Sequence, residues 1–207
     1  MPRHLQFGLL VFIMFLLGGI AYYYDLQKRI KDLLRSQPES AHPYITENPS
    51  YSPTAPVKKA RLFFPSIAKD GLLEVEEREI HTSDVPSIEG KEIVAELIKG
   101  SREGREAAIP SLTKLREVYV TGEGLAYVDL TREVVDDHPG GLTREISSIY
   151  AIVNSLTENV PSIREVQILV DGAEVETLAG HVDLSRPYEQ DLSMTTLAEN
   201  PQLSGLK

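Results

Sequence analysis

The sequence predicts an α+β fold of strand, strand, helix, strand, strand, helix, strand and strand, with two helices packed on one face of a sheet. Three observations lead to this prediction. Apolar residues recur at steps of three and four between Ile146 and Leu156, as in an amphipathic helix. Apolar and polar residues alternate in several short segments, as in half-buried strands. Asp171-Gly172 supplies the positive φ angles of a two-residue hairpin turn.

Length and composition limit the classes of protein that remain. The 207 residues allow one domain plus appendages, and a hydrophobic fraction of 42% is enough for a core. The net charge of −10 argues against nucleic acid as a partner, because phosphate contacts need clustered Lys and Arg. Without cysteine there is no disulfide framework, no thiolate nucleophile and no Cys-based zinc site. We expect no cofactor and no enzymatic activity.

Residues 1–35 are expected to form a transmembrane anchor with a short helical extension. Leu5 to Tyr24 is a run without formal charge, and roughly 20 apolar residues span a bilayer core. Its three closing tyrosines suit the headgroup layer. The alternative is a cleaved signal peptide, for which the apolar run is long.

Residues 36–56 are expected to be a linker. Five prolines lie among Ser, Thr, Asn and Glu, and prolines at that density prevent both helix formation and sheet pairing. A docking site for a proline-reading partner is the alternative.

The domain is expected to span residues 57–187 and to begin with a ββα unit. Strands are predicted at 61–64 and 72–80, around a turn at 69–71. On the second strand Glu74, Glu76 and Arg78 should form a solvent-exposed face. A helix should start after Pro86 and end at Lys99-Gly100.

A second ββα unit and a last hairpin are expected to complete the domain. Strands at 115–120 and 125–130 flank a Gly-containing turn, and the helix that includes Ile146–Leu156 follows. The segment 166–170 should then pair through Asp171-Gly172 with a returning strand that reaches Leu178. Residues 188–207 are polar and are expected to be a frayed tail.

Several polar residues are candidates for a site. His181 and Asp183 would share one face of a strand, and Asp129 could join them to form a metal site or an acid/base pair. The alternative is a structural histidine beside a capping Asp. Val128–Arg132 and Val182–Arg186 share the pattern V-D-L-[ST]-R, which suggests matching structural roles or coincidence.

Other candidates lie in and before the second long helix. Gly140-Gly141 could form an anion-binding turn but lacks the phosphate-loop pattern, so a sharp turn into the helix is favoured. Ser147, Ser148 and Ser155 lack the Gly-x-Ser-x-Gly elbow of hydrolases. The residues proposed for structural or interaction roles are Asp129, Arg132, Gly140, Gly141, Asn154, Glu158, Asp171, Gly172, Gly180, His181, Asp183 and Arg186.

Four segments together resemble a known family. YVDL at 127–130, IVNSLTE at 152–158, ILVDG at 168–172 and LAGH at 178–181 resemble the GerMN domain of spore germination and sporulation proteins. The resemblance spans roughly Arg61 to Pro187. It implies an α/β domain outside the cytoplasm that acts in protein assembly and has no known chemistry.

These observations predict a single-pass protein of the bacterial cytoplasmic membrane with its domain on the extracytoplasmic side. Its partners would be the membrane, other envelope proteins or a second copy. Charge counting points the other way, because Lys28, Arg29, Lys31 and Arg35 follow the span and only Arg3, His4 and the terminal amine precede it. The extracytoplasmic orientation is the one that the family resemblance implies. The best-known family members carry two such domains and a lipid-modified Cys. The alternative function is a domain that binds a small molecule or glycan, or a hydrolase that uses Asp129, His181 and Asp183.

Overall fold

A computed structural model describes residues 56–199 of the chain. The expected anchor at 1–35 and the linker up to residue 55 lie outside the described residues. In chain order the elements are β1 (Val57–Pro65), β2 (Leu73–His81), α2 (Pro86–Ile98), β3 (Leu115–Val120), β4 (Leu125–Leu130), α3 (Glu133–Asp136), α4 (Leu142–Asn159), β5 (Glu165–Val170), β6 (Tyr188–Glu189), η1 (Leu192–Met194) and α5 (Thr196–Glu199).

The first hairpin and its helix form as predicted, although one face of β2 does not. β1 and β2 pair antiparallel over their full lengths, and α2 begins with Pro86, whose fixed φ suits the first helical turn. Gly100, at φ 80°, follows its end. The solvent-exposed face predicted for β2 is wrong. Glu76 and Arg78 are buried and Glu77 is exposed, because the inward charges pair with one another.

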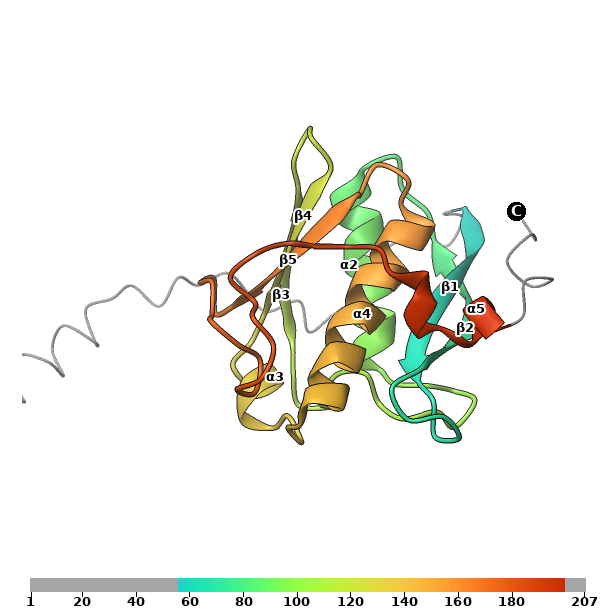
Figure 1. Cartoon of the computed structure of the whole chain (residues 1–207). Coiled ribbons are helices and arrows are strands. Elements are labelled where there is room, and N and C mark those ends of the chain that lie inside the picture. Colours follow the sequence, from blue (N-terminus) through green and yellow to red (C-terminus); the bar gives the residue numbers. More distant parts are fainter. Residues whose placement is uncertain (1–55, 200–207) are drawn as a thin grey trace, which may run out of the picture. The chain divides into compact units, whose positions relative to one another are not determined.

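The strands form two sheets, which corrects the prediction of one. β1 and β2 make a two-stranded sheet, and the second sheet has the order β3-β4-β5-β6. The helices α2 and α4 lie between the two sheets (Figure 1). The edge of β1 that does not pair with β2 is covered by α4. Ser155 Oγ accepts a hydrogen bond from Phe63 N at 3.0 Å, and Asn159 Oδ1 accepts one from Arg61 N at 2.9 Å.

The predicted last hairpin does not form. β5 pairs parallel with β4, after a crossover through α3 and α4. Asp171 and Gly172 do adopt the expected positive φ angles of 52° and 79°, yet only a single bridge, Val170 to Ala173, follows them. The returning segment is irregular because it buries Leu178 and Leu184 against the core, and β6 takes the edge of β5 instead.

Residues 188–199 belong to the folded domain, so the expectation of a frayed tail is wrong for this part. They form β6, η1 and α5. Thr195 is completely buried and bridges to Leu73 at the start of β2. Among residues 56–199, no helix has the length and apolar character of a membrane span.

Candidate functional site

A cavity of about 160 Å³ opens where three loops meet beside the first turns of α4. The loops are those between β1 and β2, between α2 and β3, and between α3 and α4, and they gather at the lower end of α4 in Figure 1. The cavity contains hydroxyl groups on one side and apolar groups on another.

The polar side of the cavity consists of buried serines. Ser147 and Ser148 lie on α4, Ser66 follows β1, and all three are at most 7% exposed. Ser66 Oγ is fully engaged, donating to Glu74 at 2.5 Å and accepting from two backbone amides. Among the described residues, no group forms a hydrogen bond with the Ser147 hydroxyl. Ser147 as a whole is 3% exposed, and its unpaired hydroxyl in the cavity wall is available to a ligand.

His138 forms part of the same wall and is held uncharged. Burial lowers its pKa, and the backbone N–H of Gly140 donates to Nδ1 at 3.0 Å. The proton of the neutral ring therefore lies on Nε2, which is 3.0 Å from Ser148 Oγ and donates to it. Since the basic nitrogen faces the backbone, His138 is not placed to take a proton from Ser148. This pair is a hydrogen-bonding surface rather than a nucleophile with its base.

The apolar side comes from the loop before β3. Ala108 and Ile109 are buried there, and Pro110 is next to them. Glu106 begins this wall, and its backbone N–H donates to Pro65 O at 3.2 Å, which ties the loop to the end of β1. At the mouth, the Glu106 carboxylate lies 3.5 Å from Arg144 Nε.

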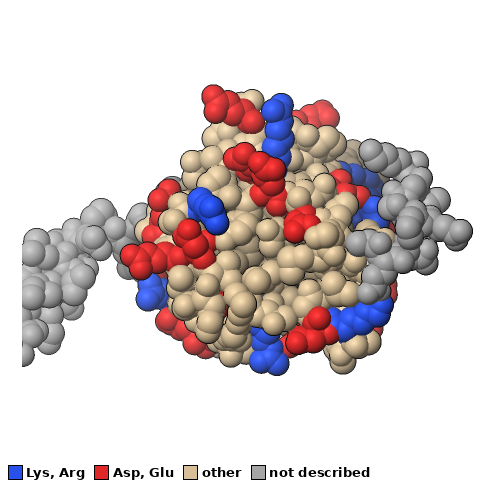
Figure 2. Space-filling model, in the orientation of Figure 1, with Lys and Arg blue, Asp and Glu red and all other residues tan. Residues whose placement is uncertain are grey.

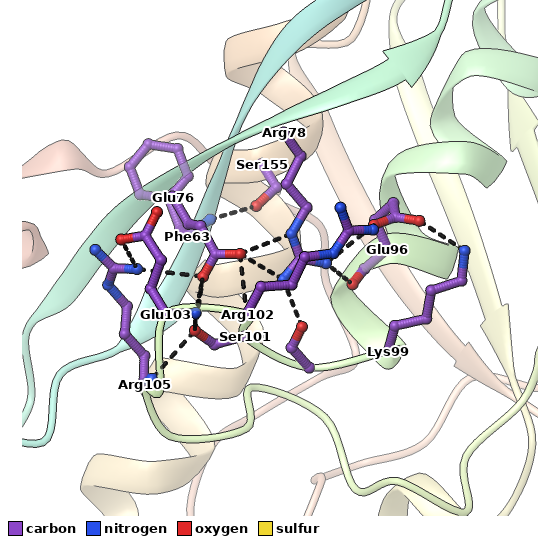
Figure 3. Close-up of polar contacts among 11 residues, drawn as sticks. Phe63, Glu76, Arg78, Glu96, Lys99, Ser101, Arg102, Glu103, Arg105 and Ser155 are labelled. Carbon is purple, nitrogen blue, oxygen red and sulfur yellow. Dashed lines mark hydrogen bonds and ion pairs between the residues drawn. The ribbon is translucent and has the colours of Figure 1, made fainter.

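A buried ion network holds the start of this loop in place (Figure 3). Arg78 lies 2.6 Å from Glu76 and 3.0 Å from Glu96, with side chains between 1% and 6% exposed. Arg105 of the loop joins Glu76 at 3.2 Å and Glu74 at 3.0 Å. Glu106, the first residue of this cavity wall, directly follows Arg105 in the chain. The network therefore fixes the position at which the wall begins.

The charge of Glu76 is stable in this network. Burial opposes its ionisation, but hydrogen bonds from Ser101, Arg78 and the backbone of Arg102 outweigh burial and lower the pKa to about 2. Arg78 also stacks over Phe64, 5.2 Å from the ring centroid. The network is therefore a structural anchor that stays charged at neutral pH.

The three residues considered for a metal or acid/base site are not brought together. Asp129 Oδ1 accepts from Gly172 N at 2.7 Å, and its Oδ2 pairs with Arg116 at 3.0 Å. His181 pairs instead with Glu145 of α4, and Asp183 accepts from Ser185 within its own turn. Within residues 56–199 there is no cluster of three potential metal-binding side chains.

Glu145 organises the loop that contains His181. It is completely buried, accepts from His181 Nδ1 at 2.5 Å, and also accepts from the backbone amides of His181 and Val182 at 3.2 and 3.1 Å. Burial opposes ionisation, yet these hydrogen bonds lower the pKa of Glu145. His181 therefore serves the loop's conformation.

The two V-D-L-[ST]-R segments adopt different conformations. The first is strand β4 as far as Leu130, whereas the second is irregular apart from one bridge between Thr177 and Asp183. Each Arg does face an Asp, Arg132 at 3.5 Å from Asp136 and Arg186 at 3.8 Å from Asp183, but both pairs are exposed. The shared letters do not reflect a shared structure.

The remaining candidates make local or packing contacts. Gly140 and Gly141, at φ 73° and 92°, turn the chain into α4. Asn154 exchanges two hydrogen bonds with the backbone of Asp191, and Glu158 pairs with Arg61 at 2.6 Å. Asp171 pairs with Arg116 at 3.1 Å, and Gly180, at φ 101°, donates to Thr177 Oγ1.

Sequence reasoning missed Glu76, Arg78, Glu145 and the cavity serines as members of polar clusters. The acid and base at alternate positions of β2 were a usable signal, because such a pair can share a buried face. For Glu145 and Ser147 the helical periodicity gives no such signal. It shows that these polar residues lie near an apolar stripe, but it does not show which other residues they contact.

Charges of both signs are mixed on the surface. On the face shown in Figure 2, Lys and Arg are dispersed among Asp and Glu around a broad uncharged area. This face carries no basic stripe of the kind that follows a nucleic-acid backbone.

Comparison with known proteins gives one family match. The model of the Germane family, described as "Sporulation and spore germination", matches residues 61–176. No protein of curated function matches the chain.

The solved structures that are similar to this chain include three whose TM-scores are below 0.5. A presumed lipoprotein from Clostridium perfringens has 27% identity and a TM-score of 0.47, with 64% of this chain and 87% of that chain covered. The tandem GerMN domains of the sporulation protein GerM from Bacillus subtilis give 18% identity and a TM-score of 0.48, with 66% and 46% covered. The first GerMN domain of that protein gives 18% identity and a TM-score of 0.45, with 65% and 96% covered.

Proposed function

Because the chain belongs to the Germane family of sporulation and spore germination domains, we propose that it is an interaction domain for protein assembly in the bacterial envelope. The segment Leu5 to Tyr24 anchors it in the cytoplasmic membrane, and the domain faces the extracytoplasmic side. The process it serves is sporulation, germination or a related envelope process.

The observation that supports an interaction role is a set of three exposed apolar side chains that are close in sequence to residues of the cavity. We define the loop end as Ile67, Leu112 and Leu142, which are 73%, 65% and 53% exposed. Each lies within two residues of a residue that lines the cavity. Single exposed hydrophobic residues are ordinary, but several large exposed apolar side chains on the segments that form a concavity are typical of surfaces that bind a partner.

Site-specific photocrosslinking in living cells tests this role. A crosslinking residue at Leu112 should capture one defined envelope protein or a second copy of the chain. The same residue at Glu79, which is exposed on β2 away from the loop end, is the matched control and should not capture it. Ile67→Asp should reduce capture from Leu112. Capture of only lipid, or of the same products from both positions, would contradict the proposal.

Orientation is tested separately with a C-terminal reporter that is active only outside the cytoplasm. Activity is expected. An inactive reporter on a membrane-inserted chain would place the domain in the cytoplasm, as charge counting predicts.

A second candidate function is the binding of a small molecule, and the cavity at α4 favours it. The cavity contains the hydroxyl of Ser147, which has no partner among the described residues, and a buried apolar wall, which is the usual composition of a ligand site. Hydrolysis is not proposed, because Asp129, His181 and Asp183 have separate partners.

A further inference from the structure

We propose that the cavity formed by α4 and the loops before β2, β3 and α4 binds one uncharged six-membered ring with a polar edge and an apolar face. This is the chemistry of a pyranose, either free or at the end of a glycan. The proposal rests on the second candidate function, ligand binding, and is independent of the assembly role.

The size of the cavity sets the size of the ligand. Its volume is about 160 Å³, and an engineered apolar cavity of about 150 Å³ holds one benzene molecule. One six-membered ring therefore fits. Because three loops form an open mouth, substituents or a following sugar can extend into solvent.

The polar wall requires a ligand that can form hydrogen bonds. Thr143 and Ser147 lie one helical turn apart on α4, as do Arg144 and Ser148, so these side chains line one side of the cavity. Ser147 is 3% exposed and has no partner among the described residues. A purely apolar occupant would bury its hydroxyl unsatisfied, which is unfavourable. Ring hydroxyls can both donate to and accept from it.

The apolar part of the lining requires an apolar surface on the same ligand. Ala108 and Ile109 are buried and Pro110 adjoins them, so this wall offers carbon atoms to the ring. A pyranose meets both requirements, because its hydroxyls project around the ring while its C–H groups form the faces.

The charges around the cavity indicate an uncharged ligand. His138 is neutral, since burial lowers its pKa and its two nitrogens are occupied by Gly140 and Ser148. At the mouth Arg144 is already paired with Glu106. The one other charged residue of the described lining, Asp70, is exposed to solvent. A charged ring would therefore be desolvated beside serine hydroxyls and a neutral imidazole, and only the exposed Asp70 carboxylate could face a cation.

The site is formed before the ligand arrives. Arg105 ties the start of the apolar wall to Glu74 and Glu76, and Pro65 O accepts from Glu106 N. Gly71 lies against Thr143, and a Cβ added to Gly71 would lie 3.4 Å from the Thr143 methyl group. Little ordering of the protein is needed on binding, which favours even a small ligand.

Ligand-observed NMR on the full chain in nanodiscs tests the proposal. Nanodiscs avoid sugar-headed detergents, which would compete for the site. The neutral probes are methyl β-D-glucopyranoside and N-acetylglucosamine, the charged probes are glucuronate and glucosamine, and p-cresol is a ring with one hydroxyl.

The neutral sugars are expected to bind with a dissociation constant on the order of 1 mM, as for a ligand of about a dozen heavy atoms, and the charged sugars should bind at least about fivefold more weakly. Ser147→Ala should weaken neutral-sugar binding about fivefold, the effect of one hydrogen bond. It should fold, because its hydroxyl has no partner among the described residues and Ala favours helix. Ser148→Ala is a second variant and should also weaken binding. Ser162→Ala, at an exposed turn outside the cavity lining, is the matched control and should bind as the native chain does.

Absence of sugar binding at concentrations on the order of 20 mM, or binding that Ser147→Ala leaves unchanged, would overturn the pyranose assignment. Binding of p-cresol alone, lost in Ser147→Ala, would overturn it while the ligand-binding function remained. If no probe binds, the pyranose assignment and the ligand-binding function are both wrong. The assembly role depends on the crosslinking result alone.

Discussion

Glu76 and Arg78, two residues apart on β2, form an ion pair of 2.6 Å in which each side chain is 1% exposed. The pair joins three parts of the chain, since Glu96 of α2 binds Arg78 and Arg105 of the next loop binds Glu76. Removing one member of the pair should therefore lower the free energy of unfolding mostly because the other buried charge is left without its partner.

Removal of Arg78 should strongly destabilise the domain. We expect Arg78→Met to lower the free energy of unfolding by about 3–5 kcal/mol, because Glu76 and Glu96 would keep their buried charges with fewer partners. Urea denaturation of the full chain measures this. Lys59→Met, which breaks the exposed pair with Glu77, is the control and should cost less than about 1 kcal/mol. Equal effects of the two substitutions would contradict the buried network.

Acid should weaken the domain through Glu76. Its pKa is lowered from 4.5 to about 2 on folding, so the unfolded chain binds more protons than the folded one between these values. The corresponding stabilisation, about 3 kcal/mol, is present above pH 4.5 and is lost as the pH falls towards 2. Denaturation curves at several pH values should show a smaller loss in Glu76→Gln than in the native chain. Parallel losses in the two proteins would rule out Glu76 as the titrating group.

Glu145 should control the loop around His181. Glu145→Gln places an amide opposite the donors His181 N, Val182 N and His181 Nδ1, so hydrogen exchange of the two backbone amides should accelerate about tenfold, equivalent to about 1.4 kcal/mol. His181→Ala should have a smaller effect, because Glu145 keeps its backbone donors. If His181→Ala accelerates exchange as much as Glu145→Gln, the side-chain contact is the dominant one.

The C-terminal segment of the domain should detach when Asn154 is shortened. Asn154 donates to Asp191 O at 2.8 Å and accepts from Asp191 N at 3.0 Å. Asn154→Ala should therefore cost about 1–3 kcal/mol and expose residues 188–199 to limited proteolysis. Ser193→Ala, which removes only a contact within the turn at Asp191, is the control. Unchanged cleavage in Asn154→Ala would show that β6 and Thr195 suffice to hold the segment.

Local pattern was enough to predict most elements. The apolar stripe of α4, the proline and glycine that bound α2, and the two antiparallel hairpins are encoded by neighbours in sequence. The strand with which β5 pairs is not encoded by neighbours in sequence. Asp171-Gly172 correctly predicts a turn, but the turn does not determine whether β5 pairs with the segment that follows or with β4, which lies before α4 in the chain.

The cavity was equally hidden from the sequence, for a related reason. Ser147 and His138 are nine residues apart in the sequence, but Ser66 and Ile109 come from distant loops. Only the packing of β1 against α4, and the ion network that fixes the loop at Arg105, place these groups around one space. By pattern alone, charged residues at alternate positions of β2 indicate a solvent-exposed face, because the further partners Glu96 and Arg105 lie on other elements.

The parallel pairing of β4 and β5 has a consequence for synthesis on the ribosome. When β4 emerges it has only β3 beside it, and its other edge stays bare until α3, α4 and the loop after α4 have been translated. We expect the nascent chain to expose the apolar strand Leu125–Leu130 during that interval, so chaperone capture should be strongest there and should end once Val170 has left the exit tunnel.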